Sequence, residues 1–148
     1  MGSHPYVYFI PYRDDLQQAL DELREREFAA GRYNPVMMFP PCPVDERTPP
    51  GPGAQHESIQ EAMEAADADG TRSILDIEFV GDDPDFGIAR RLTDDDLEAL
   101  FETITPTRAQ VLDVVPMEEV ERGEAVCLPF YDSGGQPAGI CFAGYSCD

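Results

Sequence analysis

The sequence predicts a single α+β domain with a mixed or mainly antiparallel sheet of about five to six strands, three to four helices on one side of it and a C-terminal β-hairpin. Three observations lead to this class. The 148 residues match the length of one domain. Strand-like and helix-like runs follow one another without a repeated unit. Two apolar runs near the end flank the turn Ser133-Gly134-Gly135, which is typical of a hairpin.

The first 56 residues predict a strand, a helix, a short strand and a long loop. Residues 6–10 are aromatic and β-branched and predict a strand. Residues 14–30 carry apolar side chains at helical spacing, and Gly31 is a natural helix stop. A short strand is expected at 36–39. Residues 40–56 are rich in proline and glycine and predict an irregular loop, because proline fixes φ and lacks an N–H.

The next segment predicts a helix and two strands. Ser58 and Glu61 have the spacing of a capping box and start a helix that ends near Gly70. Residues 74–80 predict a well-buried strand. After a turn rich in aspartate, residues 86–92 predict the strand that returns beside it.

Two further helices are expected before the hairpin. Thr93 caps the first, with Asp96 at the fourth place of the capping box. Thr107 and Gln110 have the same spacing and open a short helix, which Pro116 stops.

The hairpin sequence suggests a pairing register. With Ser133-Gly134-Gly135 as the loop, Val126 faces Phe142 on one side of the hairpin, and Cys127 faces Cys141 on the other. Without an export signal, these thiols are expected to be reduced. Pro129 cannot donate to a neighbouring strand, so a sheet edge is expected at that point.

Charge is the strongest compositional signal. Residues 57–148 hold 22 acids and five arginines, a net charge of −17, whereas residues 1–56 hold eight acids and five arginines, a net charge of −3. Such a field repels nucleic acids and anionic membranes and favours a basic protein surface as partner. All ten basic residues are arginine, which is typical of a high-GC bacterial genome.

The start of the chain gives no targeting signal. It has neither a basic region nor an apolar run, and no apolar stretch reaches about 18 residues, so a cytoplasmic location is expected. The residues Gly2-Ser3-His4 have the composition of a cloning remnant.

We interpret the chain as an acidic, non-enzymatic interaction domain of inhibitor or immunity type. No cofactor and no metal ligand set is expected. The expected contact residues are acids of the turn, of the helix after Thr93 and of the segment before the hairpin: Asp82, Asp83, Asp85, Asp95, Glu98, Glu102, Glu118, Glu119 and Glu121.

One alternative is a small hydrolase or transferase near the proline-rich loop. A nucleophile needs a nearby base, and Cys42 with His56 would supply that pair. The carboxylates Asp76 and Glu78 offer a second arrangement for hydrolysis.

A second alternative is a divalent-cation site. Asp67, Asp69, Gly70 and Asp76 have part of the spacing of a calcium loop. In that alignment Ala65 stands where the first ligand should be, which weakens the hypothesis.

Overall fold

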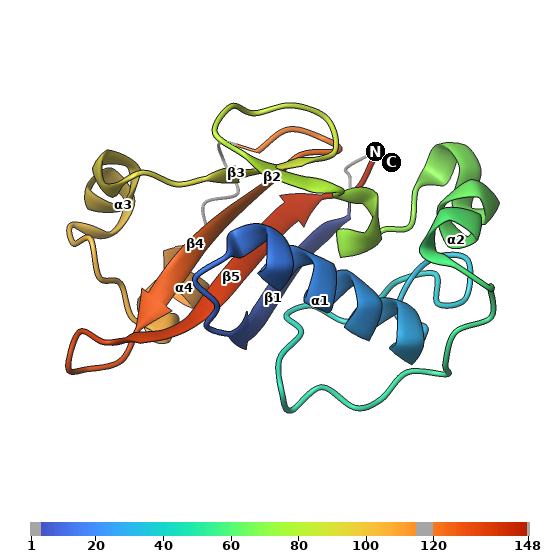
Figure 1. Cartoon of the computed structure of the whole chain (residues 1–148), viewed down its shortest axis with the longest axis horizontal. Helices are drawn as coiled ribbons and strands as arrows, with labels where there is room; N and C mark the ends of the chain where they lie inside the picture. Colours follow the sequence, from blue (N-terminus) through green and yellow to red (C-terminus); the bar gives the residue numbers. More distant parts are fainter. Residues whose placement is uncertain (1–3, 115–119, 148) are drawn as a thin grey trace.

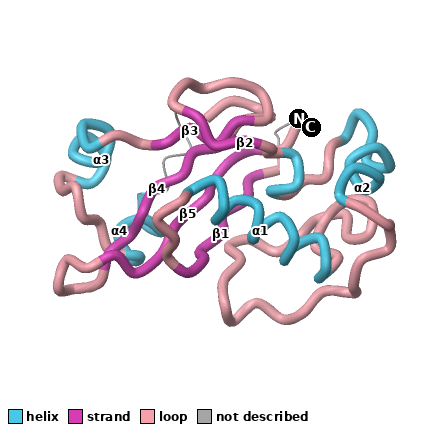
Figure 2. The backbone as a smooth tube through the Cα atoms, in the orientation of Figure 1, coloured by secondary structure: helices cyan, strands magenta, loops and turns pink. Residues whose placement is uncertain are grey.

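A five-stranded mixed sheet runs through the residues that the computed structural model describes, 4–114 and 120–147 (Figures 1 and 2). In the order β1-β5-β4-β3-β2, its strands are β1 (Pro5–Pro11), β5 (Pro137–Tyr145), β4 (Ala125–Tyr131), β3 (Ile88–Arg91) and β2 (Phe79–Gly81). The described residues also form four α-helices: α1 (Leu16–Ala30), α2 (Ile59–Ala66), α3 (Asp94–Phe101) and α4 (Arg108–Val114). This architecture confirms the predicted single α+β domain and its hairpin.

The two ends of the sheet are built differently. β1, β5 and β4 pair antiparallel along most of their lengths. β3 adds to β4 in parallel, and β2, which is 3 residues long, adds to β3 in parallel. The long strands therefore form the β1–β5–β4 end, and the short strands form the opposite edge.

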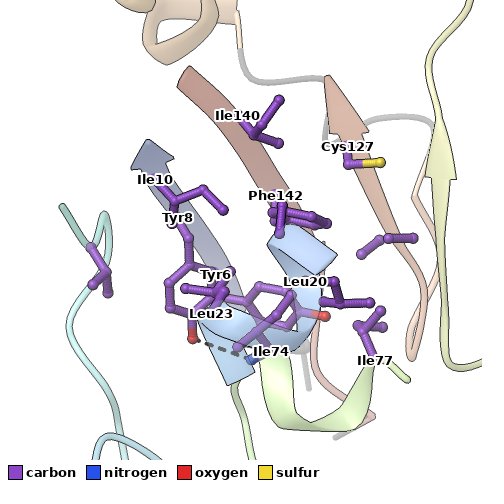
Figure 3. Close-up of a cluster of buried hydrophobic side chains, with 14 residues drawn as sticks. Tyr6, Tyr8, Ile10, Leu20, Leu23, Ile74, Ile77, Cys127, Ile140 and Phe142 are labelled. Carbon is purple, nitrogen blue, oxygen red and sulfur yellow. Dashed lines mark hydrogen bonds between the residues drawn. The ribbon is translucent and has the colours of Figure 1, made fainter. Parts of the chain in front are cut away.

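One face of the sheet is covered by α1. Tyr6, Tyr8 and Phe142 point to this face and pack against Leu20 and Leu23 of α1 (Figure 3). These five side chains are almost fully buried. The Tyr8 hydroxyl accepts a hydrogen bond from the Ile74 backbone N–H at 3.2 Å, so its polar tip is satisfied inside the core.

The other face is covered by α3 and α4. Leu128 and Cys141 of the hairpin pack against Leu97 of α3 and Val111 of α4. Figure 1 shows α1 in front of the sheet and α4 behind it. The prediction that the helices lie on one side is therefore wrong. The reason is visible in β1, whose residues 6–10 are all buried, as expected for a strand with apolar neighbours on both faces.

Three of the predicted helix ends have the expected bonds. Gly31 ends α1 with φ of 73°, in the left-handed region that glycine adopts most easily. Thr93 and Asp96 form the reciprocal capping box of α3. Thr107 and Gln110 exchange the same two bonds before α4. The predicted stop at Pro116 lies outside the described residues.

The start of α2 differs from the prediction in one bond. The Ser58 hydroxyl accepts from the Glu61 backbone N–H at 3.1 Å, as expected. The Glu61 carboxylate accepts from the Glu57 N–H instead of returning to Ser58. The helix is still capped, because both side chains receive backbone donors.

Residues 74–80 do not form one buried strand. Ser73 accepts from the Leu75 N–H and starts a 3₁₀ turn over Ile74–Asp76, so strand geometry begins only at Phe79. The Gln17 side chain then takes a neighbouring strand's place beside β2, because its amide accepts from the Val80 N–H at 2.8 Å and donates to the Glu78 C=O at 3.1 Å.

The other two strand predictions in this region also need correction. Residues 36–39 form turns and bends, with the Met37 N–H bonded to the Tyr33 C=O. The segment 86–92 contains β3, but β3 runs parallel to β2 instead of returning. The Gly87 C=O accepts from the Phe79 N–H, so the connecting loop has already carried the chain back to the start of β2.

The hairpin register is one residue away from the predicted one. Val126 faces Ala143 and Cys127 faces Phe142, because the pairing shifts between Phe130 and Tyr131. Cys127 and Cys141 therefore lie in the cores of opposite faces, where they are buried and free, and they do not face each other as predicted. A single bulge residue near the turn shifts one strand by one position relative to the other. Residues that were predicted to share a face of the hairpin therefore lie on opposite faces.

The edge prediction at Pro129 holds locally. β4 lies inside the sheet, but its pairing with β3 ends at Cys127, so no β3 residue needs an N–H from Pro129. Separately, no helix of the described residues combines the length and the apolar character that crossing a membrane requires.

Residues 40–56 form the predicted irregular loop, which is tied to the domain at several points. The Val44 N–H donates to the Val7 C=O at 2.8 Å, and the Phe9 N–H donates to the Val44 C=O at 2.9 Å, so the loop covers part of the free edge of β1. At its other end the Gly53 N–H donates to the Ala30 C=O at 2.9 Å.

Candidate functional site

The loop between β2 and β3 carries three of the predicted contact residues. Asp82, Asp83 and Asp85 are all exposed. Asp82 forms an ion pair with Arg91 of β3 at 3.2 Å, in which both side chains remain at least half exposed. Such a pair contributes little to stability. These aspartates are therefore available at the surface and are not required by the core.

The helix α3 and the residue directly after it carry three more of them. Asp95, Glu98 and Glu102 are exposed. Asp96 differs from them, because its carboxylate accepts from the Thr93 backbone N–H and pairs with Arg90 at 3.1 Å. These bonds lower the pKa of Asp96 below its ordinary value, and the bond from the Thr93 N–H has the largest effect. Asp96 thus holds the helix end.

The last described residue of the predicted set, Glu121, is exposed in the segment before β4. That segment touches the β2–β3 loop, since the Gly87 N–H donates to the Gly123 C=O at 2.8 Å. A Cβ added at Gly123 would meet the Phe86 ring at 2.3 Å, so the ring lies against this glycine. Glu118 and Glu119 lie outside the described residues.

The seven described residues of the predicted set lie on three segments at one edge of the sheet, and we call them the acidic edge. The Asp82–Arg91 pair links the β2–β3 loop to the end of β3, which precedes α3, and the Gly87–Gly123 bond links the loop to the segment that holds Glu121. Figure 1 shows α3 further along, beyond the end of β3. The members are Asp82, Asp83, Asp85, Asp95, Glu98, Glu102 and Glu121.

In the segment with part of the spacing of a calcium loop, the last carboxylate, Asp76, already accepts hydrogen bonds from the protein. Asp76 accepts from the Thr71 backbone N–H at 3.0 Å and from the Thr71 hydroxyl at 2.9 Å. Burial raises the pKa of Asp76, and the two Thr71 bonds oppose that rise only in part. Asp67 and Asp69 are exposed. Throughout the described ranges, no three His, Cys, Asp or Glu side chains gather in a way that could hold a metal ion.

The proposed nucleophile and base have other surroundings. The His56 Nδ1 lies 2.8 Å from the Tyr33 hydroxyl, which occupies the nitrogen on that side of the ring. Burial raises the pKa of the Cys42 thiol, and a hydrogen bond with the Val7 backbone lowers it only partly. A raised pKa reduces the thiolate fraction, which is opposite to what a nucleophilic cysteine requires.

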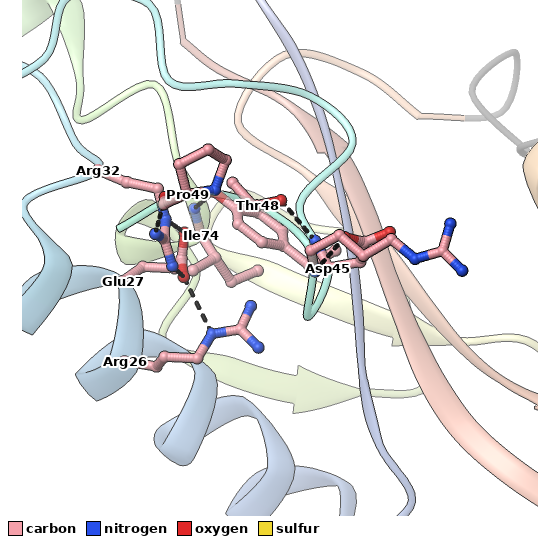
Figure 4. A network of polar contacts seen from close by, with 9 residues as sticks. Arg26, Glu27, Arg32, Asp45, Thr48, Pro49 and Ile74 are labelled. Atoms are coloured by element: carbon pink, nitrogen blue, oxygen red, sulfur yellow. Dashed lines mark hydrogen bonds and ion pairs between the residues drawn. The ribbon is translucent and has the colours of Figure 1, made fainter. Parts of the chain in front are cut away.

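A buried ion pair that the sequence analysis did not identify anchors the proline-rich loop (Figure 4). Glu27 is fully buried and binds Arg32 through both carboxylate oxygens, at 2.8 and 2.7 Å. Arg26 donates to the same carboxylate at 3.0 Å. Arg32 also donates to the Pro49 C=O at 3.0 Å. The five-residue separation of Glu27 and Arg32 spans the end of α1, so helix periodicity gave no signal for it.

Comparison of the chain with protein-family models, with curated proteins and with solved structures gave no match.

Proposed function

We propose that this chain is an acidic, non-enzymatic interaction domain of inhibitor or immunity type, which covers a basic surface of a partner protein. The observation that carries the proposal is that all seven acidic-edge residues are exposed, on three segments at one edge of the sheet.

The distribution of charge supports a contact role. The net charge of −17 within residues 57–148 creates a field that speeds encounter with a cationic surface. Exposed carboxylates repel one another, so they add nothing to the folding free energy by being close together. A basic partner would relieve this repulsion. Its association rate would be raised by charge attraction, and it would fall as the salt concentration increases.

The surroundings of the alternative sites weigh in the same direction. Cys42 has a raised pKa, His56 is engaged by Tyr33, and the Asp76 carboxylate is engaged by Thr71. Of the three, Cys42 argues most clearly against catalysis, because a raised thiol pKa lowers the fraction of the nucleophilic thiolate.

The proposal is tested by capture with two matched variants. In the edge variant the seven acidic-edge residues are changed to Asn or Gln. In the control variant seven other exposed acids are changed in the same way, which gives the same net charge: Asp14, Asp21, Glu22, Glu25, Glu57, Glu64 and Asp69. Each protein is immobilised and exposed to lysate of the source organism at low and high salt, and retained proteins are quantified.

We expect a basic protein that wild type and the control variant retain at low salt, and that the edge variant loses. High salt should release it from wild type and from the control variant. Equal retention by the edge variant contradicts the proposal. Equal loss from both variants also contradicts it, because binding would then depend on bulk charge and not on this edge.

A further inference from the structure

A cavity of about 450 Å³ opens beside the end of β1, away from the acidic edge. Phe9, Ile10 and Pro11 of β1 and Phe130 of β4 form its apolar walls. Small-molecule sites in proteins fall in the range of about 300 to 1,000 Å³ and combine such walls with a few polar groups. The volume and the lining are therefore those of a ligand cavity.

Two arginines reach this cavity from different elements. Arg26 comes from α1, and Arg108 is the first residue of α4, on the opposite face of the sheet. The Arg108 guanidinium lies over the Phe9 ring, 4.6 Å from its centroid. Two nitrogens, Nη2 of Arg26 and Nε of Arg108, are buried and have no hydrogen-bond partner among the described residues. Unsatisfied buried donors are costly. Both side chains are also partly exposed, at 36% for Arg26 and 33% for Arg108, so an anion in the cavity can pair with the accessible part of these cations.

The carboxylates beside the arginines leave room for a competing anion. Glu27 is shared between Arg26 and Arg32, and Asp45 pairs with Arg108. Glu46 is different, because its side chain is 71% exposed and its Oε1 lies 3.7 Å from Arg108 Nη1. Such a loose pair is weak. A ligand carboxylate could take the place of Glu46 without uncovering a buried charge.

The local charge balance is unusual for this chain. The charged residues that line the cavity are Arg26, Arg108 and Glu46. Together with the residues linked to them by ion pairs, Glu27, Arg32 and Asp45, they make a group of three arginines and three acids. The chain as a whole carries a net charge of −20. This neutral region is therefore much less repulsive to an anion than the acidic edge.

The edge of β1 at the cavity does not favour an added strand. Pro11 lacks an N–H, and the Phe9 N–H is already donated to the Val44 C=O. Main-chain pairing with an extended peptide needs free donors. A second cavity of about 170 Å³, which shares Ile10, Pro11 and Arg26 with the first, offers further space. These cavities therefore suit a small molecule better than an extended peptide.

We propose that this cavity binds a small carboxylate with an apolar body, held by Arg26 and Arg108 in competition with Glu46. The apolar body would contact Ile10 and Phe130, and the carboxylate would displace the Glu46 side chain from Arg108. Glu46 then acts as an internal competitor, so its removal should strengthen binding.

The test is a titration with 4-phenylbutanoate, followed by NMR of the Ile10 methyl groups. The uncharged analogue 4-phenylbutan-1-ol has the same apolar body and serves as the ligand control. We expect Glu46→Gln to tighten binding about threefold and Arg26→Gln to weaken it about tenfold, which corresponds to the loss of one charge-assisted contact. Arg47→Gln, an exposed arginine that lines neither cavity, should leave the affinity unchanged.

Each result decides for or against the proposal. A saturable Ile10 shift with the carboxylate, weaker binding of the alcohol and the opposite effects of the two variants support it. Absence of a shift at about 10 mM ligand overturns it. Equal binding of acid and alcohol, or an unchanged affinity in Glu46→Gln, also overturns it. Glu46 is an exposed residue, so its variant tests the site without threatening the fold.

Discussion

The two ends of the sheet differ in what their residues contact. At the β1–β5–β4 end, long strands are buried on both faces, and the proline-rich loop covers part of the free edge. At the β3–β2 end, strands of 4 and 3 residues carry exposed acids in the loop between them. Burial is therefore concentrated in the half of the sheet with long strands, whereas the short-strand edge carries exposed acids that the core does not use.

This division separates stability from contact. Apolar area removed from water contributes about 25 cal/mol per Å², so the buried half supplies most of the folding free energy. Exposed carboxylates contribute little to it. A surface that is not needed for folding is free to be shaped by a partner, as we propose for the acidic edge.

The largest expected effect contrasts two phenylalanines. Phe142 is fully buried in β5, and Phe79 in β2 is 58% exposed. Phe142→Ala should lower the free energy of unfolding by about 4 kcal/mol, because it leaves a cavity in the core. Phe79→Ala should change it by less than about 0.5 kcal/mol. Urea unfolding followed by circular dichroism measures both, and similar losses would remove the contrast between the two ends.

The next effect concerns the ion pair that anchors the loop. Glu27→Ala should lower the free energy of unfolding by about 3 kcal/mol, because it leaves the nearly buried Arg32 without its partner. The exposed pair between Glu22 of α1 and Arg13, which precedes the helix, is the control, and Glu22→Ala should cost less than about 1 kcal/mol. A loss in Glu27→Ala as small as in the control would show that the loop is held by other contacts.

A smaller effect is expected at the start of α3. The Thr93 hydroxyl accepts a hydrogen bond from the Asp96 N–H, and the Asp96 carboxylate accepts one from the Thr93 N–H. Thr93→Ala should therefore cost about 1 kcal/mol. Thermal unfolding would measure the loss, and Thr93→Ser, which keeps the hydroxyl, should recover most of it. Failure of serine to recover stability would point to the methyl group instead.

The smallest effects are two opposite pH dependences. The pKa of Asp76 is raised by burial, so its contribution to stability falls as pH rises from the ordinary aspartate value through the raised one. The pKa of Asp96 is lowered, so its contribution is present above the ordinary value and is lost as pH falls through the lowered one. Titration of both carboxyl carbons by NMR would check the directions. Midpoints in the reverse order would contradict them.

Much of the fold was predictable from local signals in the sequence. Gly31, Thr93 with Asp96 and Thr107 with Gln110 act within one helical turn, and each formed the expected bonds. The class and the hairpin followed from periodicity and a glycine-rich turn. These signals need only neighbouring residues, which is why the sequence shows them.

The errors came from interactions between distant residues. The Gln17 amide replaces a strand beside β2, and the bulge at Phe130 shifts the register of the hairpin. The Glu27–Arg32 pair and the cavity between Arg26 and Arg108 also depend on how elements pack. At the acidic edge, composition predicted the residue set, whereas the contact between Phe86 and Gly123 that brings two of its segments together had no local signal.

The edge variant, with all seven acidic-edge residues neutralised, tests the separation of stability from contact most directly. Its free energy of unfolding and its retention of the basic partner are measured on the same protein. We expect stability within about 1 kcal/mol of wild type, because lost exposed ion pairs and relieved repulsion nearly cancel. Partner retention should be lost. A variant that unfolds more easily by several kcal/mol while still retaining the partner would contradict the account, because the acids would then serve the fold.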